Sequence, residues 1–160
     1  MIREWLHWLF GVKPVGGFDD VPSQRDKPSP SSHFTVEELL AKKRQQYPRR
    51  DGYFVLTVQD SNSLEPLVDD NSVVVCEDLR SAQGKKWLKA ASLRAGDVCS
   101  YQTATCRQIL HQIVEVDAKN RLFRFRGFNN YASDAQWVKE EEVLLRAFEF
   151  CSARVEEEGD

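Results

Sequence analysis

The chain has 160 residues, of which 41% are hydrophobic and 29% charged, so it is long enough for one domain with a substantial core and short for two. Its formal net charge of −3 favours neither nucleic acid nor an anionic membrane as a partner, and we expect no nucleic-acid binding.

No two of its cysteines form a CxxC pair and only three histidines accompany them, so we expect no metal site and no cofactor. The cysteine positions predict reduced, mostly buried thiols and a cytoplasmic protein. The four cysteines are Cys76, Cys99, Cys106 and Cys151.

The first twelve residues, MIREWLHWLFGV, form a short apolar arm interrupted by charged side chains. A membrane-spanning helix needs roughly twenty apolar residues, and a secretory signal needs an uninterrupted apolar stretch, so the arm predicts neither. Its tryptophans and leucines can form one helical stripe, which suits a partner protein or the surface of a membrane. The alternative is an arm that packs on its own domain or on a second copy of the chain, in a homodimer.

Residues 13–32 are interpreted as a flexible linker, since they hold four of the six prolines and little apolar pattern. A helix that packs on the domain is predicted over residues 33–48. Thr35 and Glu38 have the spacing of a capping box, and Pro48 ends the helix. The basic cluster KKRQQYPRR at its end is interpreted as a solvated helix end rather than a nucleic-acid site.

The pattern then becomes that of β-strands, rich in β-branched and aromatic residues. We predict a mostly antiparallel β-domain over residues 49–155, with closed or sandwich-like sheets that hide the edge strands, and an acidic tail over 156–160. A polar stretch, residues 78–96, is expected to be an excursion over the surface. The predicted strands are 53–58, 72–78, 97–102, 107–116, 121–127 and 142–150.

Ser63 is a candidate nucleophile, because it follows the apolar strand 53–58 after a short polar step. A sheet fixes the backbone at the end of a strand, and the following loop leaves a reactive group accessible. The alternative is an ordinary turn serine that only makes hydrogen bonds.

His111 is the candidate base. Strand alternation in ILHQIVEV places Ile109, His111 and Ile113 on one face, where a histidine is often only a core residue. The other two histidines lie in the arm and beside the linker, so an imidazole base for Ser63 within the domain has to be His111.

Asp134 is the candidate that would orient the imidazole ring of His111. It lies in RGFNNYASDAQWV, where Asn129 and Asn130 tolerate sharp loop geometry. The alternative is an ordinary turn with a capping aspartate. Spacing does not decide between them, because the members of such a group meet in space and not in sequence.

Four segments of the chain stand in an order that is shared with a known family. They are 61–75, which begins SNSLEP, 94–98, 109–116 and 126–134. In this order they resemble the sequence boxes of type I signal peptidases and of the related repressor-type autoproteases. The chain is most similar to the serine–histidine branch, which includes the archaeal and endoplasmic-reticulum signal peptidases, because His111 stands where the other branch has lysine. The resemblance covers about residues 53–150 and implies a signal-peptidase-like β-domain.

The resemblance implies a role for each candidate residue. Ser63 would attack the scissile carbonyl, His111 would act as general base and acid, and Asp134 would orient the ring. The Ser63 backbone N–H and the Ser61 hydroxyl would form the oxyanion hole. Asn129 and Asn130 would support the site.

The expected function is therefore a soluble serine endopeptidase that cleaves a dedicated protein substrate or its own N-terminal segment, around residues 15–18. Phe128 stands where members of that family have an aspartate, so the site would rely on Asp134 alone or on a pair of Ser63 and His111 without a carboxylate. The alternative is a catalytically inactive module with the peptidase fold, which serves protein–protein interaction or dimerisation. Residues 1–12 would recruit this module to its partner, or to a membrane surface if the arm binds lipid.

Overall fold

The computed structural model of the chain describes residues 33–58, 63–65, 67–68, 72–103, 105 and 107–154. The predictions for the arm, the linker, the acidic tail and Ser61 fall outside these residues. The elements, in chain order, are α2 (Val36–Gln46), η1 (Arg49–Asp51), β1 (Tyr53–Thr57), β2 (Ser72–Asp78), α3 (Ala82–Ala90), β3 (Val98–Gln102), β4 (Gln108–Asp117), β5 (Leu122–Arg126), β6 (Trp137–Lys139), η2 (Glu140–Glu142) and β7 (Val143–Ser152).

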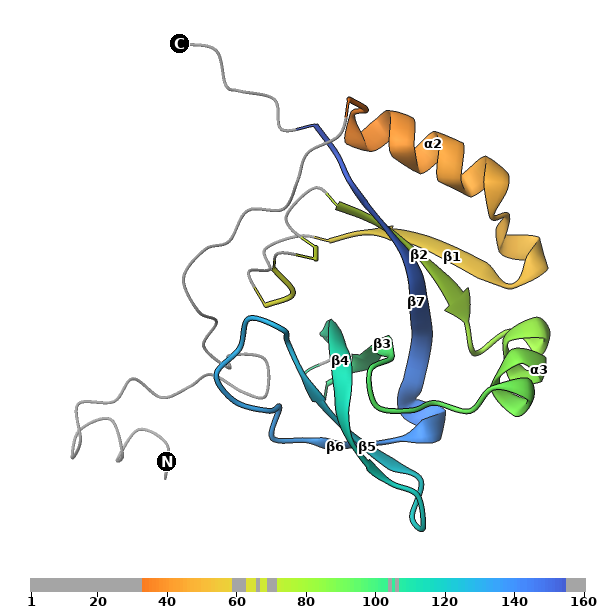
Figure 1. Cartoon of the computed structure of the whole chain (residues 1–160). Helices are drawn as coiled ribbons and strands as arrows, with labels where there is room; N and C mark the ends of the chain where they lie inside the picture. The colour runs from red at the N-terminus through yellow and green to blue at the C-terminus, as the bar shows by residue number, and fades with distance from the viewer. Residues whose placement is uncertain are drawn as a thin grey trace.

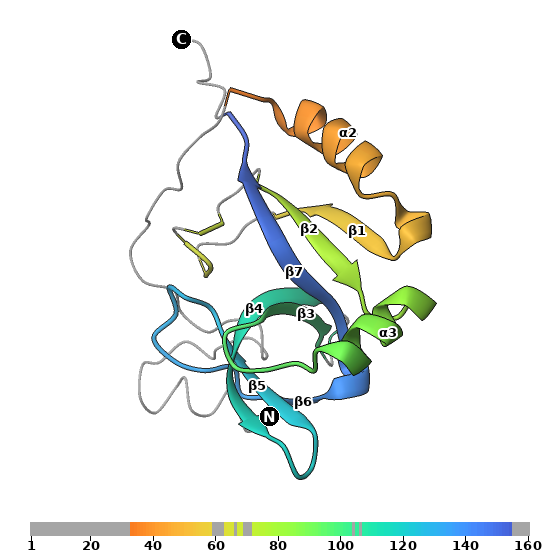
Figure 2. The same ribbon diagram turned by 45° about the vertical axis from the view of Figure 1, so that its right-hand side comes forward.

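The strands form one antiparallel sheet in the order β1-β2-β7-β3-β4-β5-β6. Figures 1 and 2 show that this sheet curls into a half-barrel, with α2 over β1 and β2 and with α3 beside the end of β2. The mostly β, antiparallel prediction is confirmed, and each of the six predicted strands is present. Within the described residues the sheet has two ends, β1 and β6, so it is an open half-barrel rather than a closed or sandwiched arrangement.

Among the described strands, β7 is the one that joins the two parts of the sheet. It pairs with β2 on one side and with β3 on the other, and a register shift interrupts each ladder. Its Leu145 is fully buried in a core cluster that also contains Val74 of β2 and Val98 of β3. The half with β1 and β2 and the half with β3 to β6 therefore share a core across β7.

Helix α2 confirms the predicted capping box. The Thr35 hydroxyl accepts a hydrogen bond from the Glu38 N–H at 3.2 Å, and the Glu38 carboxylate accepts one from the Thr35 N–H at 2.9 Å. Such a cap contributes about 1 kcal/mol to helix stability. Leu39 is the buried residue of the helix and packs against Val55 and Val73, which places the helix on β1 and β2.

Residues 78–96, predicted as a polar excursion over the surface, are mostly exposed or half-buried and contain the helix α3, which was not predicted. The Ser81 hydroxyl caps the helix by accepting from the Gly84 N–H at 2.8 Å. A Cβ at Gly84 would lie 1.9 Å from the Asp78 carbonyl oxygen, so the helix approaches the end of β2 more closely than any larger residue permits. The same glycine lowers the intrinsic helix propensity of the segment, and the helix was not predicted for this reason.

The buried cysteines give a prediction about thiol reactivity. Burial raises the pKa of the Cys76 thiol to about 12, and it also raises the pKa of Cys99 well above its ordinary value. At about pH 8, native protein should therefore leave both thiols unreacted with iodoacetamide, and of the three cysteines that the structure describes the partly exposed Cys151 should be alkylated first. Peptide mass spectrometry of native and urea-unfolded samples measures this order. Rapid native alkylation of Cys99 would contradict it.

Candidate active site

Three predicted side chains form a continuous line of hydrogen-bonding contacts. The Ser63 Oγ lies 3.0 Å from His111 Nε2, and His111 Nδ1 lies 2.7 Å from Asp134 Oδ2. The structure therefore brings together a hydroxyl, an imidazole and a carboxylate that are 48 and 23 residues apart in the chain.

Ser63 is held by the turn that follows β1. The next residue, Leu64, is fully buried, and its carbonyl accepts hydrogen bonds from the N–H groups of Leu67 and Val68. Both Leu64 and Val68 belong to the core cluster shared across β7. The buried side chains of Leu64 and Val68 thus fix the backbone of Ser63 at the edge of the core. In Figures 1 and 2 this turn and the loop between β5 and β6 lie on the same side of the half-barrel.

His111 lies in β4, opposite Cys99 of β3, and is 7% exposed. Ile113 on the same strand is buried in the core cluster beneath β3 to β6, and Ile109 packs against that cluster. The predicted alternation is therefore confirmed. The histidine is a core-facing residue as well as a candidate base, because its Nε2 reaches Ser63.

Asp134 lies in the loop between β5 and β6 and has no solvent exposure. Its N–H donates to the Phe125 carbonyl at 2.7 Å, and its carbonyl accepts from the Arg124 guanidinium at 3.2 Å, so β5 fixes the loop. Its Oδ2 is contacted by two groups, His111 Nδ1 and the hydroxyl of Tyr101, each at 2.7 Å. Tyr101 was not among the predicted site residues. A buried tyrosine hydroxyl needs a polar partner, but the pattern of β3 does not say which one.

The protonation of the imidazole follows from these contacts. An ionised carboxylate only accepts hydrogen bonds, so we assign the proton of neutral His111 to Nδ1. Nε2 then has a free lone pair that faces the Ser63 hydroxyl. This is the tautomer in which a histidine can remove a proton from a serine.

The loop residues 127–130 pack directly on Ser63. The Asn129 N–H donates to the Ser63 carbonyl at 2.8 Å, and the Asn130 N–H donates to the Gly127 carbonyl at 3.1 Å. A Cβ at Gly127 would lie 2.5 Å from the Ser63 carbonyl oxygen and 2.8 Å from the Ser63 Cβ. Asn129 and Asn130 are both buried, and the backbone of Asn129 ties the loop to the serine.

Phe128 is 41% exposed, and the carboxylate beside His111 is that of Asp134.

The oxyanion hole stays a prediction, since Ser61 lies outside the described residues. Within the described ranges, no three side chains of histidine, cysteine, aspartate or glutamate gather as a metal ion would require.

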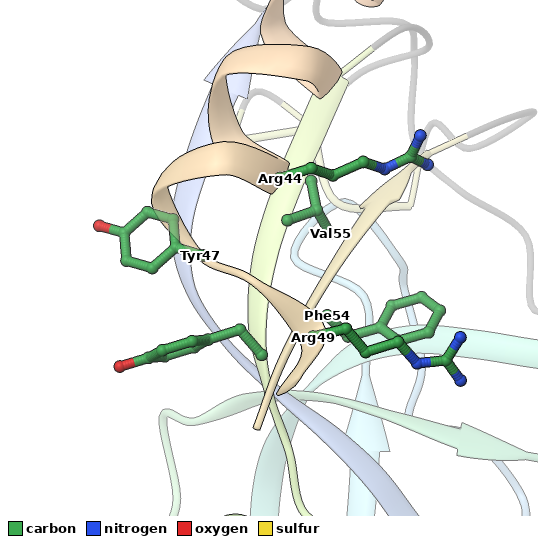
Figure 3. Close-up of a pocket in the computed structure, with 6 residues that line it drawn as sticks. Arg44, Tyr47, Arg49, Phe54 and Val55 are labelled. Carbon is green, nitrogen blue, oxygen red and sulfur yellow. The ribbon is translucent and has the colours of Figure 1, made fainter. Parts of the chain in front are cut away.

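A cavity of about 300 Å³ lies away from these residues, between α2, η1 and β1. Figure 3 shows the guanidinium groups of Arg44 and Arg49 on one side of it and the ring of Tyr47 on the other. Arg49 lies over the ring of Phe54 at 5.4 Å. Ser63, His111 and Asp134 do not line this cavity, so it is not part of the candidate active site.

Comparison with protein-family models, with curated proteins and with solved structures finds no match for this chain. In the part of the chain that the structure describes, no helix has the length and apolar character needed to cross a membrane. The chemistry of the site is therefore the basis for assigning a function to this chain.

Proposed function

We propose that this chain is a serine endopeptidase of the signal-peptidase-like type, acting through Ser63, His111 and Asp134. The observation that carries the proposal is the line of contacts from the Ser63 hydroxyl through His111 to the fully buried Asp134 carboxylate. A turn serine needs no such partners, whereas a nucleophilic serine needs a base and a group that orients the base. The seven-stranded antiparallel half-barrel is compatible with this type of enzyme.

In the proposed reaction, the Ser63 oxygen attacks the carbonyl carbon of a peptide bond while its proton passes to His111 Nε2. The negative charge of Asp134 stabilises the imidazolium that forms. The tetrahedral intermediate then collapses, its C–N bond breaks, and His111 gives the proton to the departing amine. Water, deprotonated by His111, hydrolyses the acyl-enzyme ester and restores the Ser63 hydroxyl.

The proposed substrate is a peptide in extended conformation, bound along an edge of the sheet so that its carbonyl reaches Ser63. It belongs to a dedicated partner protein or to the chain's own N-terminal segment. The backbone N–H of Ser63 and the hydroxyl of Ser61 are the proposed donors to the oxyanion, and removing one such donor typically lowers turnover by about 100- to 1,000-fold.

The proposal is tested by labelling the full-length chain with a fluorophosphonate, which forms a covalent bond with activated serines. We expect labelling at Ser63, located by peptide mass spectrometry, and its complete loss in Ser63→Ala. The control is Ser92→Ala, which makes the same chemical change at an exposed serine outside the site. Cleavage is measured in parallel with a synthetic peptide of residues 1–32 as the substrate.

Three outcomes separate the interpretations. Labelling of the wild type and of Ser92→Ala but not of Ser63→Ala supports an activated Ser63, and cleavage of the peptide by the same two proteins identifies the N-terminal segment as a substrate. Labelling without cleavage of the peptide points to a separate partner as the substrate. A wild-type chain that is neither labelled nor able to cleave would refute the peptidase proposal and favour an inactive module for protein–protein interaction.

A further inference from the structure

Tyr101 stands out among the buried side chains, since its one polar atom is directed at the candidate active site. The residue has no solvent exposure, and its ring packs on Phe125 with centroids 4.7 Å apart. A phenylalanine would fill the same space without bringing a polar atom into the core. The tyrosine hydroxyl donates to Asp134 Oδ2 at 2.7 Å, from a strand that lies 33 residues before the aspartate.

The Tyr101 hydroxyl is one of two groups in close contact with the Asp134 carboxylate. Both close contacts of the carboxylate, from Tyr101 and His111, fall on Oδ2, while Oδ1 is buried and has no hydrogen-bond partner. The terminal torsion of an aspartate is soft, so a single contact with His111 would leave the group free to turn. A buried anion also needs donors in place of the water that it has lost.

We propose that Tyr101 is a positioning residue, which holds the Asp134 carboxylate in the orientation that keeps a proton on His111 Nδ1. This inference rests on the proposed function, because it assigns Tyr101 a place in the same reaction. Tyr101 touches neither the serine nor the substrate in this role. It acts through Asp134, and therefore through the tautomer of the imidazole.

The first test compares Tyr101→Phe with Tyr131→Phe in the full-length chain. Tyr131 is 72% exposed in the loop between β5 and β6, so this variant makes the same chemical change without a buried donor. For Tyr101→Phe we expect kcat, or the rate of fluorophosphonate labelling, to fall about tenfold with KM unchanged, as the loss of one hydrogen bond to a charged group implies. We expect no change in Tyr131→Phe.

A double-mutant cycle distinguishes positioning from packing. If Tyr101 acts through Asp134, then Tyr101→Phe should lower the labelling rate no further in a chain that already carries Asp134→Ala. Equal losses in both backgrounds would assign the tyrosine to the core alone and overturn the inference.

The last measurement does not depend on activity. The exchange with water of the His111 Nδ1 proton, followed by proton NMR, should become about tenfold faster in Tyr101→Phe and stay unchanged in Tyr131→Phe. An unchanged exchange rate in Tyr101→Phe would overturn the inference even if the wild type is an active peptidase. Failure of the wild type both to label and to cleave would refute the proposed function, while the exchange rate would still show whether Tyr101 secures the contact between His111 and Asp134.

Discussion

Asp134→Asn should lower turnover about 10,000-fold, the typical effect of removing the carboxylate from a group of this kind. The asparagine has nearly the same shape, so the buried loop should keep its fold. His111 would then face a neutral amide, and the imidazolium that forms when Ser63 loses its proton would have no negative charge beside it. The measurement is the rate of fluorophosphonate labelling, with circular dichroism to confirm the fold.

The matched control is Asp117→Asn, the same change at the end of β4. Asp117 ends β4, the strand that holds His111, and its carboxylate accepts hydrogen bonds from Asn120 in the turn that follows, so labelling should be unchanged. A labelling rate for Asp134→Asn within a factor of ten of the wild type would contradict the role proposed for this carboxylate. Ser63 and His111 would then act as a pair without it.

Gly127→Ala should lower the labelling rate about 100-fold, the scale of loss expected when a reactive group moves by about 1 Å. The added Cβ would lie 2.5 Å from the Ser63 carbonyl oxygen. This oxygen is a backbone atom, so no side-chain rotation relieves the overlap. The serine or the loop therefore has to shift, and the contact between Ser63 and His111 lengthens. Substrate cleavage and labelling should fall together.

Gly96→Ala controls for a general loss of stability. Gly96 has a φ of 98°, which strains an alanine, but a Cβ there meets no atom within 4 Å. This variant should lose stability and keep its labelling rate under conditions in which it is folded. If Gly127→Ala labels as fast as Gly96→Ala, the packing of the loop on Ser63 does not matter for reactivity.

Strand pattern and the order of segments were sufficient to predict Ser63, His111 and Asp134, and the structure places their side chains in contact. The strands were predictable because period-two alternation is a local property of the chain. The contact itself depends on how the sheet curls, and a sequence pattern contains no direct information about that curl.

The features that escaped prediction share this non-local cause. Tyr101 pairs with Ile109 in the ladder between β3 and β4, yet its hydroxyl reaches a loop that follows β5. The strand β6 has only three residues and is defined by its pairing with β5. Gly84 lowered the helix signal of α3, although the close approach to Asp78 is what requires a glycine there.

The central place of β7 in the sheet has a consequence for when the chain becomes reactive. Ser63 belongs to the half with β1 and β2, while His111 and Asp134 belong to the half with β3 to β6. Contacts between residues far apart in sequence form late in folding, and a chain folds as its N-terminal part leaves the ribosome first. Among the described strands, β7 is the last to be synthesised and the one that pairs with both halves. An incomplete nascent chain would thus carry the serine without its base, and neighbouring polypeptides would be protected from it until β7 has been made.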